Sequence, residues 1–231
     1  MKNKILIVLL LCLISCKMDN RKSATEERKV NKEEKKVKKS IDTLFYDEQG
    51  DTIETQTAHL KNNYKLIIFP ARDKNHEVLN YRLIKGKKDN TYLLLDPYQT
   101  NRRFYYQGVD FKNYFALHSN GGGTSNFYFW LYDKETGNEV LTGITGDFDL
   151  KNELILYTDE DDEYKRFIYD VNTKVKTLIN LPYDLMDKHE CTQYINSPKT
   201  LYIKRVTKKY YYLAFEICEP LLVEFRVKKA K

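Results

Sequence analysis

His118 and the glycine-rich stretch after it come closest to an acid–base or anion-binding site. Residues 119–126 hold three consecutive glycines among Ser, Thr and Asn, so their backbone amides could bind a phosphate or an oxyanion. The stretch lacks the Lys-Ser/Thr of a P-loop and the Gly-x-Ser-x-Gly of a hydrolase elbow. Asp147 and Asp149 are the carboxylates that would complete a pocket with His118. The alternative is a plain hairpin loop, and we assign no catalytic residue.

Metal ligands are present, but their spacing does not suit a metal site. Residues 159–163 are five consecutive carboxylates without the alternating Asp and central Gly of an EF-hand loop. A solvated acidic tip, open to a basic partner, is therefore favoured over a calcium site. None of the four His residues has a zinc-type neighbour at i, i+4, and there is no Cys-x-x-Cys. We expect no cofactor and no metal.

Two of the four cysteines, Cys191 and Cys218, lie far from the N-terminus and could form a disulfide. The bridge would close a loop of about 27 residues and stabilise the fold by roughly 3–4 kcal/mol in the chain-entropy model. The alternative is two buried thiols on different strands.

Tyrosines form a third group of interest, above all Tyr210-Tyr211-Tyr212, which follows Lys208-Lys209. Alternate residues of a strand face opposite sides, so Tyr211 should oppose its two neighbours. One side of the trio would pack in the core. The other would suit contact with a protein or a glycan, unless it too is covered by packing.

The elements that must position these residues are strands. From residue 41 onward, short runs rich in Tyr, Phe, Ile, Leu and Val alternate with turn residues, and no window shows a helical stripe. Residues 41–231 are therefore predicted to form a single all-β domain with one core. The predicted strands are 42–46, 52–56, 64–69, 77–84, 91–95, 103–106, 114–118, 127–132, 139–141, 153–157, 164–170, 174–178, 201–206, 210–217 and 221–227.

Internal repeats indicate how these strands are arranged. Asp110-Phe-Lys-Asn aligns with Asp149-Leu-Lys-Asn, and Tyr132-Asp133 with Thr136 aligns with Tyr169-Asp170 and Thr173. In Tyr-Asp-x-x-Thr, the Asp or Thr side chain should bond nearby backbone N–H groups and fix a hairpin turn. A period near 40 with about four strands resembles β-propeller blades. The prediction is a propeller-like antiparallel meander of about four units, with a β-sandwich or an open meander as the alternative.

Charge is divided unevenly along the chain. The formal net charge is +6, but residues 1–40 hold twelve Lys/Arg against five Asp/Glu, whereas residues 41–231 hold 27 against 28. The domain is thus near neutral, which argues against a nucleic-acid partner. Residues 17–40 have almost no apolar content and are predicted to be a charged flexible tether.

The first residues carry the signature of a secretory leader. Two lysines precede ten apolar residues at positions 5–14, a run too short to cross a membrane as a helix. Leu13-Ile14-Ser15-Cys16 resembles the bacterial lipobox, in which a small residue precedes the Cys that becomes the lipidated N-terminus. The resemblance implies a signal peptide at 1–15, a diacylglycerol and a further acyl chain such as palmitate on Cys16, and a tether over 16–40. Several acyl chains give effectively permanent membrane anchoring.

The resemblance, of the Bacteroidota type, also carries an expectation about place and role. Lys17 follows the Cys, where an Asp would suggest the inner membrane, so the outer membrane is favoured with the leaflet undecided. The leading prediction is a non-enzymatic β-domain that binds an envelope protein or glycan. The alternatives are an envelope hydrolase or lyase acting on glycan or peptide around His118, and an immunity or accessory lipoprotein.

Overall fold

The structure is a computed structural model of the 231-residue chain. It describes residues 45–46, 52–74, 76–96, 104–120, 127–162, 165–184, 201–217 and 221–231. All of these belong to one compact unit, Thr43–Lys231. The predicted signal peptide and tether lie outside the described residues.

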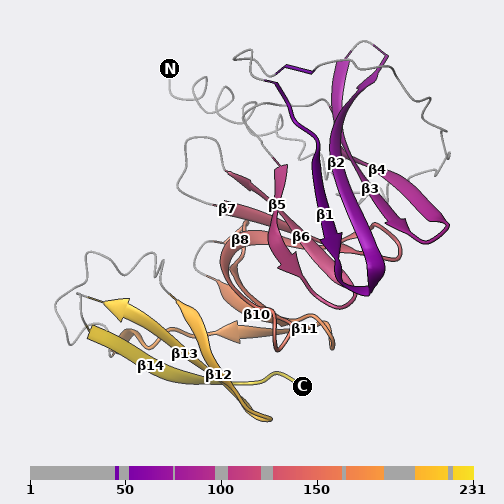
Figure 1. The fold of residues 1–231 in the computed structure, drawn as a ribbon. Helices are drawn as coiled ribbons and strands as arrows, with labels where there is room; N and C mark the ends of the chain where they lie inside the picture. The colour runs from indigo at the N-terminus through magenta and orange to yellow at the C-terminus, as the bar shows by residue number, and fades with distance from the viewer. Residues whose placement is uncertain are drawn as a thin grey trace, which may run out of the picture. The chain divides into compact units, whose positions relative to one another are not determined.

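The described residues form three antiparallel sheets in which chain neighbours are also sheet neighbours (Figure 1). The first sheet has the order β1-β2-β3-β4, the second runs from β5 to β11, and the third is β12-β13-β14. The strands are β1 (Gln56–Leu60), β2 (Tyr64–Asp73), β3 (His76–Lys85), β4 (Lys88–Leu95), β5 (Phe104–Asp110), β6 (Tyr114–Asn120), β7 (Phe127–Asp133), β8 (Glu139–Asp149), β9 (Leu154–Thr158), β10 (Arg166–Asp170), β11 (Val175–Ile179), β12 (Tyr202–Val206), β13 (Tyr210–Ile217) and β14 (Leu221–Lys228).

The long strand β8 divides the seven-stranded sheet into two halves. Its first part pairs with β7 and its second part with β9, and the register shifts between Thr145 and Asp147. Such a bulge bends and twists a strand, and β8 curves visibly in Figure 1. Gly143 and Gly146 lie in this stretch, and a Cβ on Gly143 would come within 2.5 Å of the Tyr157 ring. Without side chains there, the two halves can fold toward each other.

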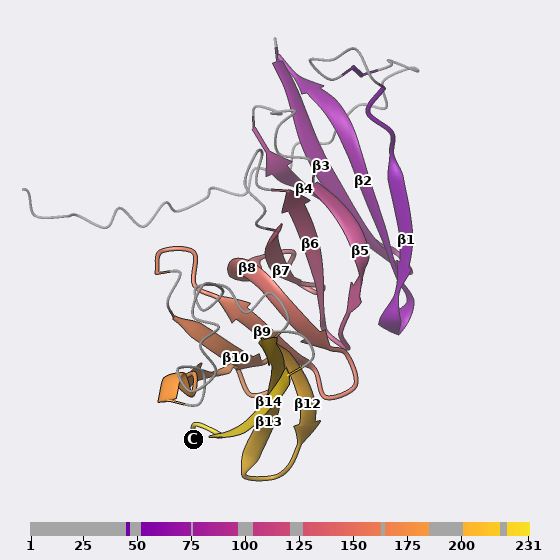
Figure 2. The ribbon, with the colours of Figure 1, turned by 90° about the vertical axis from the view of Figure 1, so that its left-hand side faces the viewer.

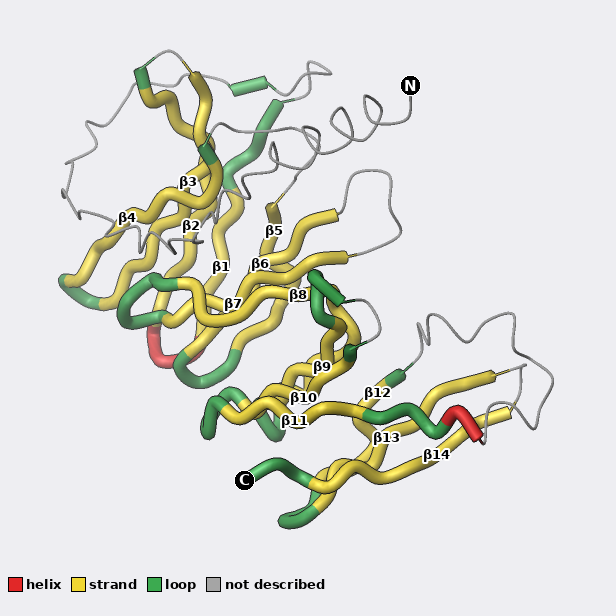
Figure 3. The backbone as a smooth tube through the Cα atoms, turned by 180° about the vertical axis from the view of Figure 1, so that it is seen from behind, coloured by secondary structure: helices red, strands yellow, loops and turns green. Residues whose placement is uncertain are grey.

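Three hydrophobic cores separate four β-layers, as the views in Figures 2 and 3 help to follow. The first core joins the four-stranded sheet to the outer face of β5–β7, through residues such as Leu66, Tyr81 and Leu117. The second lies between the two halves of the seven-stranded sheet and includes Phe129 and Tyr157. The third joins the outer face of β9–β11 to the three-stranded sheet. Alternate side chains of β6 point into the first and the second core, so both faces of this strand are covered. This explains why β6 is buried from Tyr114 to Ser119.

The all-β antiparallel class is confirmed, in the form of an open meander rather than a closed propeller. The two best repeats do not form separate blades. They run through β5–β8 and β8–β11 and lie in one continuous sheet. The predicted turn chemistry is confirmed, because Asp133 Oδ1 and Asp170 Oδ1 accept hydrogen bonds from backbone N–H groups two and three residues later.

One predicted strand, 52–56, is misplaced. Before Gln56 it contributes only an isolated bridge between Thr52 and Tyr46, whereas β1 begins at Gln56 and pairs with β2. A short 3₁₀ turn, Lys61–Asn63, then connects β1 to β2 with Asn62 and Asn63 at positive φ. The sequence of β1 has weak strand character, and its pairing with the strongly apolar β2 decides its conformation.

Candidate functional site

His118 lies near the end of β6 and is enclosed by aromatic rings, with only 3% of its surface exposed. Tyr105 of the paired strand β5 stacks on it with ring centroids 6.0 Å apart, and Phe148 of β8 meets it edge-on at 5.5 Å. Burial lowers the pKa of His118 to about 4, so the imidazole is neutral near neutral pH. Its Nδ1 has no hydrogen-bond partner among the described residues. Residues 121–126, the glycine-rich part of the loop, lie outside them.

Asp147 and Asp149 lie on either side of Phe148 in β8, and these three residues pair with consecutive residues of β9. Because side chains alternate along a strand, both carboxylates lie on the face opposite to Phe148. Asp147 Oδ2 accepts a hydrogen bond from the backbone N–H of Ile203 at 3.0 Å, which links β8 to β12. Asp149 Oδ1 accepts two backbone N–H groups of the turn that follows β8. The structure thus places an aromatic ring, and neither carboxylate, against His118. Both carboxylates serve the fold.

The acidic run, described as far as Asp162, forms the turn after β9. Asp159 Oδ1 accepts the backbone N–H of Asp161 at 3.0 Å, and Asp162 forms an ion pair with Lys165 at 2.9 Å. Burial, followed by the charges of Asp161 and Asp159, raises the pKa of Glu160. Within the described ranges, no three His, Cys, Asp or Glu side chains are grouped to hold a metal.

The cysteine predictions fall outside the described residues. Cys16, Cys191 and Cys218 are all among the residues whose structure is not described, so the lipidation and the disulfide stay predictions. In the part of the chain that the structure describes, no helix combines the length and apolar character needed to span a membrane.

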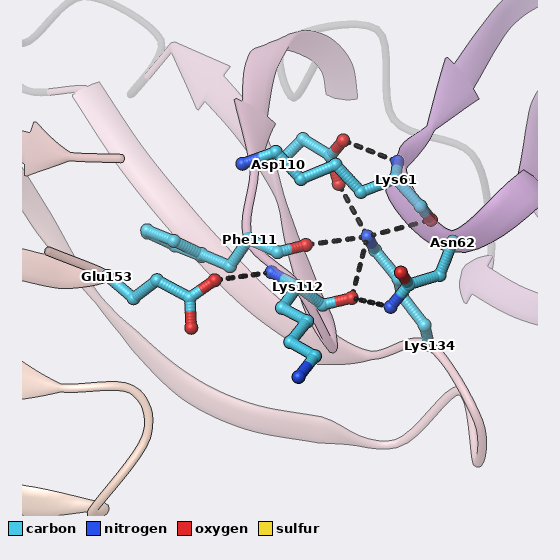
Figure 4. A network of polar contacts seen from close by, with 7 residues as sticks. All are labelled: Lys61, Asn62, Asp110, Phe111, Lys112, Lys134 and Glu153. Atoms are coloured by element: carbon cyan, nitrogen blue, oxygen red, sulfur yellow. Dashed lines mark hydrogen bonds and ion pairs between the residues drawn. The ribbon is translucent and has the colours of Figure 1, made fainter. Parts of the chain in front are cut away.

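A buried polar network centred on Lys134 was missed by the reasoning from sequence (Figure 4). The Lys134 side chain is 1% exposed, and Nζ contacts Asp110 Oδ1 at 2.6 Å and donates to the Phe111 carbonyl at 2.7 Å. Asp110 Oδ2 accepts the backbone N–H of Lys61 at 2.7 Å. Burial lowers the pKa of Lys134, and the hydrogen bond and charge of Asp110 oppose that shift.

The same network joins connections that are far apart in the sequence. Asn62 Nδ2 donates to the Lys112 carbonyl at 2.7 Å, and the Lys112 backbone N–H donates to Glu153 Oε1 at 2.6 Å. The β1–β2, β5–β6, β7–β8 and β8–β9 connections are thereby held together (Figure 4). At the place of Lys134, directly after the turn Asp, the second repeat has the buried Val171. That difference between the two repeats is the feature of the sequence that could have indicated the network. Lys134 has a structural role, because its Nζ is bonded to Asp110 and to the Phe111 carbonyl.

The outer side of the three-stranded sheet carries cations and tyrosines, and we call it the basic face. Tyr211 is 2% exposed in the core, whereas Tyr210 and Tyr212 lie on the opposite, partly exposed side, which confirms the predicted alternation. The basic face consists of Tyr202, Arg205, Tyr210, Tyr212, Arg226 and Lys228, and we include Lys208 and Lys209 of the turn that adjoins them.

Two arginines of the basic face lie over tyrosine rings. Arg205 Cζ is 4.0 Å from the centroid of Tyr212, and Arg226 Cζ is 4.9 Å from that of Tyr210. Arg205, Tyr212 and Arg226 are direct neighbours across the three strands. A guanidinium that stacks by its plane keeps its N–H edge free for a carboxylate or a phosphate.

The basic face belongs to a segment whose net charge differs from that of the rest of the domain. Residues 201–231 hold eight Lys/Arg against three Asp/Glu, a net +5, so residues 41–200 hold nineteen against twenty-five, a net −6. The near-neutral domain is therefore the sum of a basic end segment and an acidic remainder. The composition of the whole domain hides this division.

Comparison with known proteins adds no assignment, because no protein-family model, curated protein or solved structure matches the chain.

Proposed function

We propose that this chain is a lipid-anchored lipoprotein of the bacterial envelope whose β-domain binds another envelope component without catalysing a reaction. The observation that carries the binding role is the basic face. Its guanidinium groups are held over tyrosine rings before any partner arrives, so less side-chain freedom is lost on binding. Charge-assisted bonds from arginine edges to carboxylates or phosphates are stronger than bonds between neutral groups.

The anchor is supported by the first sixteen residues alone. A short basic start, an apolar run of ten residues and a Ser-Cys pair match the order of a lipobox leader, with Cys16 as the lipidated residue. The charged segment that follows would connect the domain to the lipid anchor, and Lys17 favours the outer membrane.

The geometry around His118 favours binding over the hydrolase or lyase alternative. A general base must reach the proton it removes, but the His118 ring is packed between Tyr105 and Phe148. Asp147 and Asp149 are occupied by backbone N–H groups. His118, Asp147 and Asp149 thus each make contacts that stabilise the fold.

The anchor is tested by replacing Cys16 with serine in the full chain. We expect Cys16→Ser to abolish labelling by a fatty-acid precursor and to remove the protein from the membrane fraction, since one sulfur atom carries the lipid. The control is Ser15→Ala, which keeps a small residue before the Cys and should be labelled like the wild type. If Cys16→Ser is still processed and membrane-bound, the anchor is refuted.

The binding role is tested in cells with a photoreactive amino acid in place of Tyr202, which is 38% exposed on the basic face. Light should produce covalent adducts at this position, whether lipid, glycan or protein, and Arg205→Gln/Arg226→Gln should reduce them. The matched position is Leu93, which is 57% exposed on β4. Equal adduct yields at the two positions, unaffected by the double substitution, would contradict a role for the basic face.

A further inference from the structure

We propose that the basic face lies on an anionic, phosphate-bearing lipid surface and thereby orients the β-domain on its membrane. The inference rests on the proposed function in one respect, namely that the lipid on Cys16 keeps this surface near. It names the partner that the basic face fits best.

The cations of the basic face gather at one end of the three-stranded sheet. Lys208 and Lys209 form the β12–β13 turn, and the register places Lys228 beside Tyr210 at the same end. The Lys229 backbone N–H donates to the Lys209 carbonyl at 3.0 Å, which brings the end of β14 to that turn. The sheet therefore concentrates charges that come from two separate stretches of sequence.

Among the described residues, the carboxylates near this sheet do not neutralise that end. Glu224 pairs with Lys204, and Glu216 lies further along β13, away from the turn. Asp170 lies near Tyr211 on the inner side of the sheet, where burial, followed by the charge of Asp170, raises the pKa of that tyrosine. The Oδ1 atom of Asp170 accepts a hydrogen bond from the backbone N–H of Asn172 in its own turn. Counted over the described side chains, the outer side at the turn thus has an excess of positive charge.

The arrangement suits a surface better than a single extended polymer. Arg205 and Arg226 stand on the two outer strands with Tyr212 between them, about 10 Å apart at two strand spacings. Charges spread across strands as well as along them can all meet a two-dimensional array of headgroups. A linear acidic chain would engage one row at a time.

Apolar and amphipathic side chains on the same side add to this fit. Tyr202 is 38% exposed and Leu222 is 41% exposed, both with outward-facing register positions. Tyrosine rings favour the boundary between headgroups and hydrocarbon, and basic side chains can extend past them to phosphates. The face therefore combines the two kinds of group that a lipid interface selects.

Amine footprinting of the full lipidated protein tests the proposal. The protein is reconstituted in vesicles of phosphatidylcholine alone or with added phosphatidylglycerol, and lysine acetylation is followed by mass spectrometry. We expect Lys208, Lys209 and Lys228 to react several-fold more slowly in the anionic vesicles at low salt. High salt should restore their reactivity, because surface charge is screened within about 10 Å at 0.1 M. Lys65 and Lys151, on other elements, should be unaffected.

Variants connect this protection to the basic face. Arg205→Gln/Arg226→Gln should reduce partitioning of the face to the anionic surface about 25-fold, at about fivefold per cation, and so abolish the protection. The charge-matched control is Arg72→Gln/Lys151→Gln, which should retain it; Arg72 is 57% exposed on β2. Circular dichroism would show that each variant is folded.

The outcomes separate this inference from the proposed function. Equal reactivity in the two vesicle types, or protection that survives the Arg205/Arg226 double substitution, overturns the lipid contact. Protection by soluble polyglutamate or polygalacturonate, with none from anionic vesicles, also overturns it and assigns the face to an acidic polymer. Flotation of the protein with the vesicles tests the lipid anchor independently. If the protein does not float, the result counts against the proposed function. The lysine footprint can then still be measured in detergent micelles that contain anionic lipid.

Discussion

At the scale of single residues, the fold deals with two buried ionisable groups in opposite ways. Lys134 Nζ is bonded to backbone carbonyls and to a carboxylate that opposes the lowering of its pKa by burial, whereas His118 is enclosed by aromatic rings that favour its neutral form. A histidine beside glycines suggests chemistry, so His118 is a natural candidate in the sequence. Lys134 is harder to predict, since nothing adjacent in the sequence shows that Asp110 and the Phe111 carbonyl meet it.

His118 should make the domain sensitive to acid. Its pKa falls from 6.5 to about 4 on folding, so the unfolded chain binds more protons in this range. Stability should therefore rise with pH through that window and be lost as pH falls through it, by roughly 3 kcal/mol. His118→Phe, which keeps a ring but cannot titrate, should flatten that loss in denaturant unfolding at a series of pH values. Parallel curves for wild type and variant would show that His118 does not contribute.

At the scale of elements, turns were the most predictable part and strand partners the least. The Asp of Tyr-Asp-x-x-Thr acts within its own turn, so local sequence suffices to predict it. The place of β1 depends on β2, and the docking of the β7–β8 turn depends on the four-stranded sheet. Tyr81 Oη donates to the Gly137 carbonyl at 2.6 Å, a contact 56 residues apart in the chain.

Two glycines allow this docking to be measured. Gly137 has φ +65° and a Cβ there would overlap the Tyr92 ring, whereas Gly86 has φ +57° with nothing within 4 Å. Both alanine variants should lose about 1 kcal/mol to left-handed backbone strain. Gly137→Ala should lose about 1–3 kcal/mol more, from overpacking against Tyr92. Chemical denaturation compares the two, and equal losses would mean that the turn does not press on the four-stranded sheet.

At the scale of the whole molecule, the sequence predicts the all-β class and the repeat but not the stacking. A period near 40 is compatible with blades or with a continuous meander, and the two differ only in whether β8 ends one sheet or continues it. The bend of β8, assisted by Gly143 and Gly146, selects the continuous form. The basic face was visible in part, as tyrosines beside lysines, but Arg226 joins it only through the β13–β14 register.

The stacked cores should unfold together, because each middle layer contributes to two of them. Leu213 is fully buried between the last two layers, while Trp130, the single tryptophan, packs at the first core. Leu213→Ala should cost about 2–5 kcal/mol and shift the Trp130 fluorescence transition as much as the circular dichroism transition. Leu178→Ala, at an exposed position, should shift neither appreciably. A fluorescence transition unmoved by Leu213→Ala would show that the layers separate.

The shared strand β8 has a consequence for how such a protein could change in length during evolution. It closes the first repeat and opens the second, so the repeat advances by three strands and reverses the strand direction each time. A duplication or deletion of one unit would therefore insert or remove a three-strand segment and exchange which end of the sheet the next turns occupy. Viable length variants should then occur more readily in steps of two units than of one.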